Sequence, residues 1–118
     1  MQHSLEDGIE TKHIEFTKKE IQAYKTLLNL NTDDVPDLYI AKVWPSFELF
    51  KPFIHRKVLL KESNIRRIKK LKIDTKYKAT LIHNYTKQIK QFRVHQFTLT
   101  ISKEGEQYIE IKQIFIEQ

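Results

Sequence analysis

The second half of the sequence contains four stretches rich in β-branched and aromatic residues, and this pattern constrains the fold more than any other feature. None of them contains a glycine or a proline, so each can run as an uninterrupted strand. They are HRKVLLKE (55–62), KYKATLIHNYTK (76–87), QFRVHQFTLTIS (91–102) and QYIEIKQIFIEQ (107–118). Turns fit at 74–75, around 88–91 and at 103–105, where Gly105 can adopt a positive φ. The pattern predicts four long antiparallel strands.

Side-chain parity within these stretches predicts the buried face of the sheet, because successive strand residues point to opposite sides. In the second stretch one face is shared by Tyr77, Ala79, Leu81, His83 and Tyr85. In the third stretch the apolar parity changes between Val94 and Phe97. Such a change predicts a bulge, or a strand whose buried face changes along its length.

Two helices are expected before these strands. Thr17 with Glu20 three residues later forms a capping-box pattern at the start of TKKEIQAYKTLLNL (17–30), after a short strand KHIEF (12–16). A second helix is expected after Pro36, where residues 38–50 are apolar on most sides. In that segment Pro45 should kink the helix and Pro52 should close it. A helix this apolar must be surrounded by protein, and we expect the sheet to wrap it.

Length and composition indicate one compact domain over residues 1–118, of which 40% are hydrophobic. The absence of cysteine excludes disulfides, thiolate metal sites and cysteine nucleophiles. The first 15 residues are polar and mixed in charge, unlike a signal peptide, and no apolar run approaches the ~20 residues that a spanning helix needs. We therefore expect a cytoplasmic protein without membrane insertion, in which residues 1–11 are poorly ordered.

An acidic group precedes the apolar helix. Asp33, Asp34 and Asp37 could supply acid–base chemistry, or they could form a polar turn with a negatively charged helix start, which the helix dipole favours. We favour the turn. The five histidines show no spacing typical of a metal site, and His83 and His95 lie inside predicted strands with no carboxylate nearby in sequence. We expect neither a metal nor a bound cofactor.

The order of these segments resembles the hot-dog fold, an α+β architecture in which a long antiparallel sheet wraps a central apolar helix. More narrowly, residues 12–116 are similar to the MaoC-like hydratase and dehydratase family, which acts on acyl thioesters of coenzyme A or acyl carrier protein. The similarity is carried by FTKKEIQAYKTLLNL, VPDLYIAKVWPSFELF, FIHRKVLL and LKIDTKYKATLIHNYTKQ.

The catalytic signature of that family is an aspartate followed five positions later by a histidine. Leu38, Tyr39 and Lys42 stand at this spacing from the three aspartates. The resemblance therefore implies the non-catalytic half or subunit of such an enzyme, an acyl-thioester binding protein without its own dyad. Whether the chain is an enzyme stays open, and the alternative is a divergent hydratase or thioesterase using Asp37 and His55 from different chains.

The same resemblance implies where a thioester would bind. Trp44, Phe47 and His55 are expected to line the acyl tunnel between helix and sheet. A lone hot-dog sheet exposes an edge, so we expect a homodimer, or a heterodimer with a catalytic hot-dog subunit.

The basic stretch NIRRIKKLK (64–72) carries much of the formal charge of +6. Its apolar residues recur every three positions, as in a basic helix that binds nucleic acid or an anionic surface. It has no helix-turn-helix spacing and no interleaved aromatics, so we favour a solvated strand edge and connection and rank nucleic acid last. The second-ranked interpretation is that phosphates of coenzyme A or phosphopantetheine bind here, on Arg66, Arg67, Lys69 and Lys70.

Overall fold

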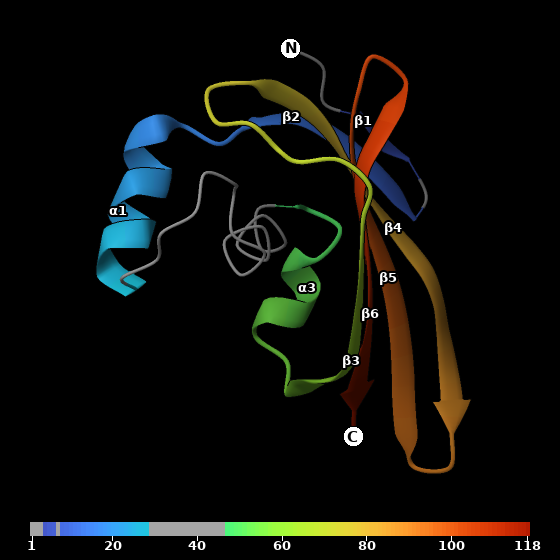
Figure 1. The fold of residues 1–118 in the computed structure, drawn as a ribbon. Coiled ribbons are helices and arrows are strands. Elements are labelled where there is room, and N and C mark those ends of the chain that lie inside the picture. Colours follow the sequence, from blue (N-terminus) through green and yellow to red (C-terminus); the bar gives the residue numbers. More distant parts are fainter. Residues whose placement is uncertain (1–3, 7, 29–46) are drawn as a thin grey trace.

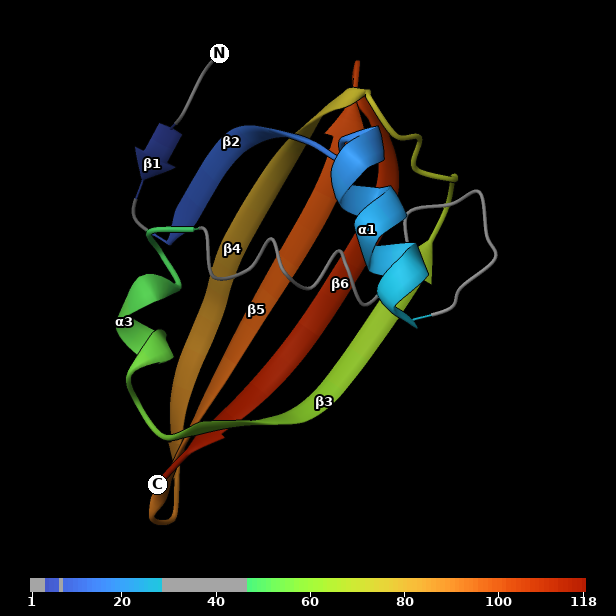
Figure 2. The same ribbon diagram turned by 90° about the vertical axis from the view of Figure 1, so that its left-hand side faces the viewer.

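The computed structural model describes residues 4–6, 8–28 and 47–118. Six strands form one antiparallel sheet in the order β1-β2-β4-β5-β6-β3. The elements are β1 (Ser4–Glu6), β2 (Ile9–Glu15), α1 (Lys18–Leu28), α3 (Lys51–Ile54), β3 (Val58–Arg67), β4 (Lys76–Ile89), β5 (Phe92–Lys103) and β6 (Glu106–Glu117). Both helices lie on the same side of the sheet (Figures 1 and 2). We call this side the inner face.

The hydrophobic core lies on the inner face of the sheet. Strands β4, β5 and β6 contribute alternate residues to it, as the predicted parity requires. Its buried members are Phe16, Ile21, Phe47, Leu71, Tyr77, Ala79, Leu81, Phe97, Leu99, Ile101, Ile109 and Ile111. The opposite face is largely polar, with Thr11 and Thr80 in hydrogen-bond contact at 3.2 Å between their hydroxyl oxygens.

Helix α1 starts where its cap was predicted. The Thr17 hydroxyl accepts a hydrogen bond from the Glu20 amide at 3.3 Å, and the Thr17 carbonyl accepts one from the Ile21 amide at 3.0 Å. The Asp74 side chain, in the turn before β4, accepts from the Lys18 amide at 2.8 Å. Ile21 faces the core, so the cap also fixes which face of α1 meets the sheet.

The predicted turns are confirmed. Asp74 and Lys90 have positive φ, at 54° and 56°. Between β5 and β6, Glu104 and Gly105 have φ of 51° and 78°, which matches the two left-handed positions of a type I′ hairpin turn.

The predicted bulge in the third stretch is wrong, because the irregularity near this position lies in the neighbouring strand. The β5 register runs without interruption from Phe92 to Ile101, whereas β4 has an extra residue between His83 and Tyr85. The extra residue also corrects the expected face of Tyr85, which pairs with Gln96 away from the inner face. The apolar parity of β5 seemed to change because a polar residue, His95, is buried on its inner face.

The predicted central helix falls mostly on residues 29–46, outside the described part of the chain. The structure resumes at Phe47, which is fully buried, and continues into α3. Pro52 does not close a helix as predicted, since it occupies the first turn of α3, where a missing amide hydrogen costs nothing. Within segment 1–11, for which poor order is predicted, residues 4–6 and 9–11 belong to β1 and β2.

Strand β3 forms one edge of the sheet and pairs only with β6 among the described strands. The first part of the basic stretch is its end, and Lys69 and Lys70 lie in the connection to β4, so the predicted strand edge and connection is confirmed. None of the described helices is long and apolar enough to cross a membrane.

Candidate functional site

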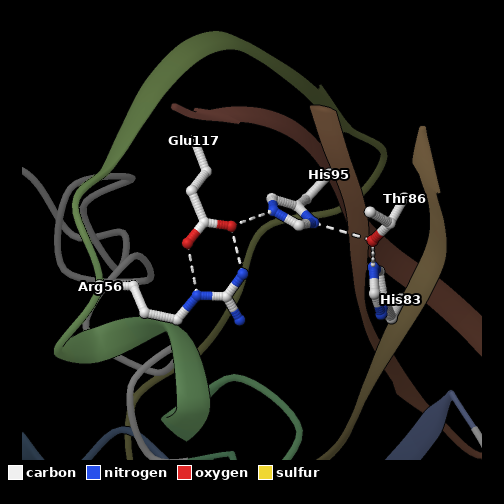
Figure 3. Close-up of polar contacts among 5 residues, drawn as sticks. All are labelled: Arg56, His83, Thr86, His95 and Glu117. Carbon is white, nitrogen blue, oxygen red and sulfur yellow. Dashed lines mark hydrogen bonds and ion pairs between the residues drawn. The ribbon is translucent and has the colours of Figure 1, made fainter. Parts of the chain in front are cut away.

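A chain of polar side chains crosses the inner face near the end of the sheet that carries the β4–β5 hairpin (Figure 3). Four elements contribute to it. Its members are Arg56 after α3, His83 and Thr86 of β4, His95 of β5 and Glu117 of β6. We call this group the histidine network.

His95 is the centre of the network and is only 2% exposed. Its Nε2 lies 3.0 Å from Oε1 of Glu117, and its Nδ1 lies 2.8 Å from the Thr86 hydroxyl oxygen. The same hydroxyl oxygen lies 2.8 Å from Nε2 of His83. A buried imidazole is therefore joined at both nitrogens, to a carboxylate on one side and through a hydroxyl to a second imidazole on the other.

Arg56 keeps the Glu117 carboxylate ionised. Its Nε donates to Oε2 at 2.5 Å, and its Nη2 donates to Oε1 in a second, parallel contact. Hydrogen bonding from Arg56 lowers the pKa of Glu117 to about 2, against the opposing effect of burial and with help from His95. Glu117 is thus an ionised, acceptor-only group at neutral pH, so His95 must donate to it from Nε2.

Aromatic rings enclose the two imidazoles. The Phe53 ring of α3 stands edge-on to His95 with centroids 4.8 Å apart, and the His83 ring stacks on Phe97 at 4.6 Å. Burial lowers the pKa of His83, as does the neighbouring His95, while a hydrogen bond with the Tyr85 backbone raises it. The balance keeps the His83 imidazole a neutral base at physiological pH.

The extra residue in β4 is what assembles the network. His83 and Thr86 are three positions apart and would point to opposite faces in a regular strand. Because Asn84 interrupts the pairing, His83 aligns with Phe97 and Thr86 aligns with His95, so both reach the inner face. On the other side of the sheet, the Asn84 side-chain oxygen accepts from the Thr98 hydroxyl at 2.7 Å.

Sequence reasoning missed this network. His95 does have a carboxylate partner, but Glu117 lies 22 residues away and meets it only through the pairing of β5 with β6. One signal was present in the sequence. Counting back by twos from Ile101 and Phe97 places His95 on the buried face, where a histidine needs polar partners.

A second buried polar feature lies on β2, where Glu10 is the cross-strand neighbour of Leu81. Glu10 of β2 is 1% exposed and accepts a hydrogen bond from the Leu49 amide at 2.6 Å. Two residues on, the Lys12 ammonium lies 4.7 Å from the centre of the Phe47 ring, and burial lowers the pKa of Lys12. Glu10 thus anchors the turn that leads into α3.

The predicted ligand-lining and catalytic residues are only partly described. Phe47 is in the core, and His55 is exposed at the end of α3, next to Arg56. Trp44, Asp33, Asp34 and Asp37 lie outside the described residues. No group of three or more potential metal ligands occurs among the residues that the structure describes.

The predicted phosphate-binding residues are spread along the β3 edge and its continuation. Arg66 is the cross-strand neighbour of Glu110, and Arg67 ends the strand. Lys69 forms an ion pair with Glu106, and its ammonium lies 5.5 Å from the centre of the Tyr108 ring. Lys70 is exposed in the connection.

Comparison with solved structures establishes the fold. The C-terminally truncated HadBC (3R-hydroxyacyl-ACP dehydratase) complex from Mycobacterium tuberculosis matches with a TM-score of 0.75 at 8% identity, over 92% of this chain and 93% of that one. A hypothetical thioesterase with coenzyme A from Streptococcus pneumoniae TIGR4 matches with a TM-score of 0.66 at 11% identity, over 97% and 85% of the two chains. At such identities the likeness concerns the fold alone, and it confirms a single α+β hot-dog domain.

A third solved structure, smu.793 from Streptococcus mutans UA159 bound to acetyl CoA, matches with a TM-score of 0.63 at 13% identity, over 100% and 90% of the two chains. Sequence comparison identifies a family other than the MaoC-like family. Protein VraC from Staphylococcus epidermidis is 42% identical over 118 residues, covering 99% of this chain and 98% of its own. Protein VraC from Staphylococcus aureus (strain MRSA252) is 32% identical over 117 residues, covering 98% and 97%. The family model described as "Uncharacterised conserved protein VraC" matches residues 1–118, and the chain belongs to that family.

Proposed function

We propose that this chain binds an acyl thioester, carried on coenzyme A or on an acyl carrier protein. The observation that carries the proposal is the aromatic inner face beneath α3, where the ring centroids of Phe53 and Phe97 are 5.3 Å apart and those of Phe50 and Phe115 are 5.4 Å apart. A fatty tail on such a surface gains about 0.8 kcal/mol per buried methylene. The hot-dog structures with coenzyme A and acetyl CoA support the choice of ligand.

The proposed role is that of a partner subunit of the MaoC-like hydratase/dehydratase type. Leu38, Tyr39 and Lys42 stand where the resemblance would require a histidine, so the catalytic dyad would come from a second hot-dog chain. Trp44, Phe47 and His55 would then shape the acyl tunnel. The HadBC dehydratase, which is a complex, supports an arrangement of this kind.

The β3 edge is the proposed contact with the second chain. Leu59 and Leu60 are 75% and 52% exposed there, and the edge of β3 away from β6, which pairs with no described strand, can present amide and carbonyl groups for antiparallel pairing. Either a second copy or a catalytic subunit would extend the sheet across this edge and cover both leucines.

The basic groups at the end of β3 are the proposed phosphate contacts. Arg66 and Arg67 suit phosphate oxygens because a guanidinium donates two parallel hydrogen bonds. Lys70 adds a point charge. Lys69 would contribute less than its charge alone predicts, because Glu106 already pairs with it.

Calorimetric titration with coenzyme A and with acyl-CoAs of increasing chain length tests the proposal. We expect tighter binding with each added methylene, up to about fourfold per group at full burial, and a weakened series in a Phe53→Ala variant. Leu27→Ala, on an exposed part of α1, is the matched control and should bind like the wild type. Equal affinity for free coenzyme A and for a long acyl-CoA would refute acyl recognition.

The second candidate function is a divergent hydratase or thioesterase, favoured by the pairing of buried His95 with ionised Glu117. The earlier candidates for this chemistry, Asp37 and His55, would act from different chains. Hydration of an enoyl thioester by the purified chain, lost in His55→Ala or in His95→Ala, identifies which imidazole is responsible. Absence of turnover in every case supports the partner-subunit role.

A further inference from the structure

We propose that His83, Thr86 and His95 form a proton-exchange site, which takes up one proton at the half-buried His83 and passes it through the Thr86 hydroxyl to His95, beside Glu117. The proposal rests on the geometry of the histidine network and does not depend on acyl-thioester binding. Such a site would give the inner face a proton donor and acceptor.

The first argument is a count of hydrogens along the network. Three contacts join His83, Thr86, His95 and Glu117, and each needs one hydrogen. Two neutral imidazoles and one hydroxyl supply these three hydrogens, so every contact is made and one imidazole nitrogen is left without a hydrogen.

The direction of the three hydrogen bonds follows from the charges. Nε2 of His95 must carry a hydrogen, since a bare imidazole nitrogen against a carboxylate is repulsive. In the neutral network, His95 therefore donates to Glu117, Thr86 donates to Nδ1 of His95, and His83 donates from Nε2 to Thr86. The nitrogen left bare is Nδ1 of His83, at the end away from the carboxylate.

Uptake of one proton can then keep all three contacts, with the two at Thr86 reversed in direction, without moving a heavy atom. The proton forms a new N–H bond at Nδ1 of His83, whose Nε2–H bond breaks as that proton moves to the Thr86 oxygen. The original Thr86 hydroxyl proton moves to Nδ1 of His95. The result is an imidazolium at His95 and the opposite neutral tautomer at His83, with one positive charge gained overall.

The surrounding charges decide where the proton stays. Glu117 of β6 touches His95 and stabilises its imidazolium, whereas Arg56 after α3 opposes it and holds Glu117 ionised. On β5, Arg93 is the cross-strand neighbour of Glu117. Phe53 and Phe97 contribute apolar walls to the same site. Among the described elements that pack here, Glu117 is therefore the anion that makes His95 the terminal acceptor.

The test is a nitrogen-15 NMR titration of the imidazoles, whose shifts distinguish the two tautomers and the imidazolium. In the wild type we expect His83 to change tautomer over the same pH interval in which His95 becomes doubly protonated. In Thr86→Val the hydroxyl is gone, so the His83 tautomer should no longer follow the protonation of His95. Thr100→Val, the matched change elsewhere on the sheet, should leave both titrations unaltered.

Two outcomes would overturn the proposal: a His83 tautomer that stays constant throughout the wild-type titration, or one that follows His95 equally well in Thr86→Val. If Thr86→Val does not fold, Thr86→Ser and Glu117→Gln decide the question. The serine hydroxyl should keep the two histidines coupled, and the neutral glutamine, which removes the anion beside His95, should leave the added proton on His83. Uncoupled histidines in Thr86→Ser, or an unchanged His95 in Glu117→Gln, would equally contradict the relay.

Discussion

Glu117 connects the candidate site to the stability of the fold, because one carboxylate receives both Arg56 and His95. Each of these partners favours its ionised form, and together they overcome the cost of removing the charge from water. Removal of Glu117 would leave the Arg56 guanidinium without its bidentate acceptor and a buried imidazole without its acceptor. Two polar partners from distant parts of the chain therefore depend on a residue one position from the end of the printed sequence.

The depressed pKa of Glu117 predicts acid sensitivity. Its folded pKa of about 2 is below the reference value of 4.5, so its contribution is complete above pH 4.5 and is lost as the pH falls toward 2. We expect Glu117→Gln to lower the free energy of unfolding by about 1–2 kcal/mol at pH 7, allowing for partial solvent screening, and by much less at pH 2. Denaturant titrations at both pH values measure this difference. Glu104→Gln, in an exposed turn, is the control, and a deficit independent of pH would contradict the assignment.

Glu10 makes a second prediction at the same scale. Replacement by alanine removes the acceptor of the Leu49 amide and leaves a partly buried donor unsatisfied, so we expect a loss of about 1–3 kcal/mol in unfolding free energy. Glu15→Ala, on the exposed end of the same strand, should change it by less than about 0.5 kcal/mol. Chemical denaturation of the two variants gives the comparison, and equal losses would show that burial of Glu10 contributes nothing specific.

At the scale of the elements, the irregularity in β4 governs where its side chains point. Asn84 shifts the alternation by one, so that the hairpin end of β4 presents Thr86 inward and Tyr85 outward. A two-residue turn at Lys90 and Gln91 then sets the register of β5 against this shifted strand. The histidine network exists because the extra residue in β4 and the turn at Lys90 and Gln91 together align Thr86 with His95.

Deletion of Asn84 tests whether it is the extra residue of β4. Without it, His83 and Thr86 are two positions apart in a regular strand and still face inward, so we expect the contacts of Thr86 with His83 and His95 to be kept. The deletion and Asn84→Ala both lose the hydrogen bond from Thr98, at a cost of about 1 kcal/mol. NMR contacts between Thr86 and His95 in both variants measure this. Loss of those contacts in the deletion would contradict the argument.

Gly105 allows a prediction about the β5–β6 turn. With φ at 78° and nothing within 4 Å of an added Cβ, Gly105→Ala should be penalised only by backbone strain, about 1 kcal/mol. Asparagine tolerates this conformation better than alanine, so Gly105→Asn should lose less stability. Thermal unfolding of both variants gives the order, and an unchanged alanine variant would be inconsistent with the turn.

Local patterns predicted the elements far better than the contacts between them. The Thr17 cap, the strands and the turns at Asp74, Lys90 and Gly105 depend on nearby residues, which the sequence displays directly. The pairing of His95 with Glu117 depends on strand register across 22 residues, and the extra residue at Asn84 has no glycine or proline to mark it. Such long-range features follow from how the whole sheet packs.

For the whole molecule, the two edges of the sheet differ in what they expose. The β1 edge is only three residues long, whereas β3 is ten residues long and exposes three large apolar side chains, those of Leu59, Leu60 and Ile65. Proteins usually shorten or protect such edges, so these exposed side chains support the proposed pairing with another chain. The proposed ligand would then bind to a unit assembled from this chain and a second hot-dog chain.

Leu59→Glu should dissociate the proposed dimer without unfolding the chain. Leu59 is 75% exposed in a single copy, so the change costs the monomer little and places a charge in the proposed interface. We expect sedimentation velocity to report a dimer for the wild type and a monomer for the variant. Leu27→Glu, at an 80% exposed position on α1, should stay dimeric. A wild type that is monomeric on its own would contradict the homodimer and leave a different, catalytic subunit as the proposed partner. Co-expression with such a subunit would test this.

Native mass spectrometry of the purified chain, alone and after addition of a long-chain acyl-CoA, tests the central claim most directly because it reads the oligomer and its ligand together. We predict that the chain retains the acyl-CoA. We predict no retained ligand when coenzyme A without an acyl chain is supplied instead. A chain that retains no acyl thioester at saturating concentration, in any oligomeric state, would contradict the proposed function.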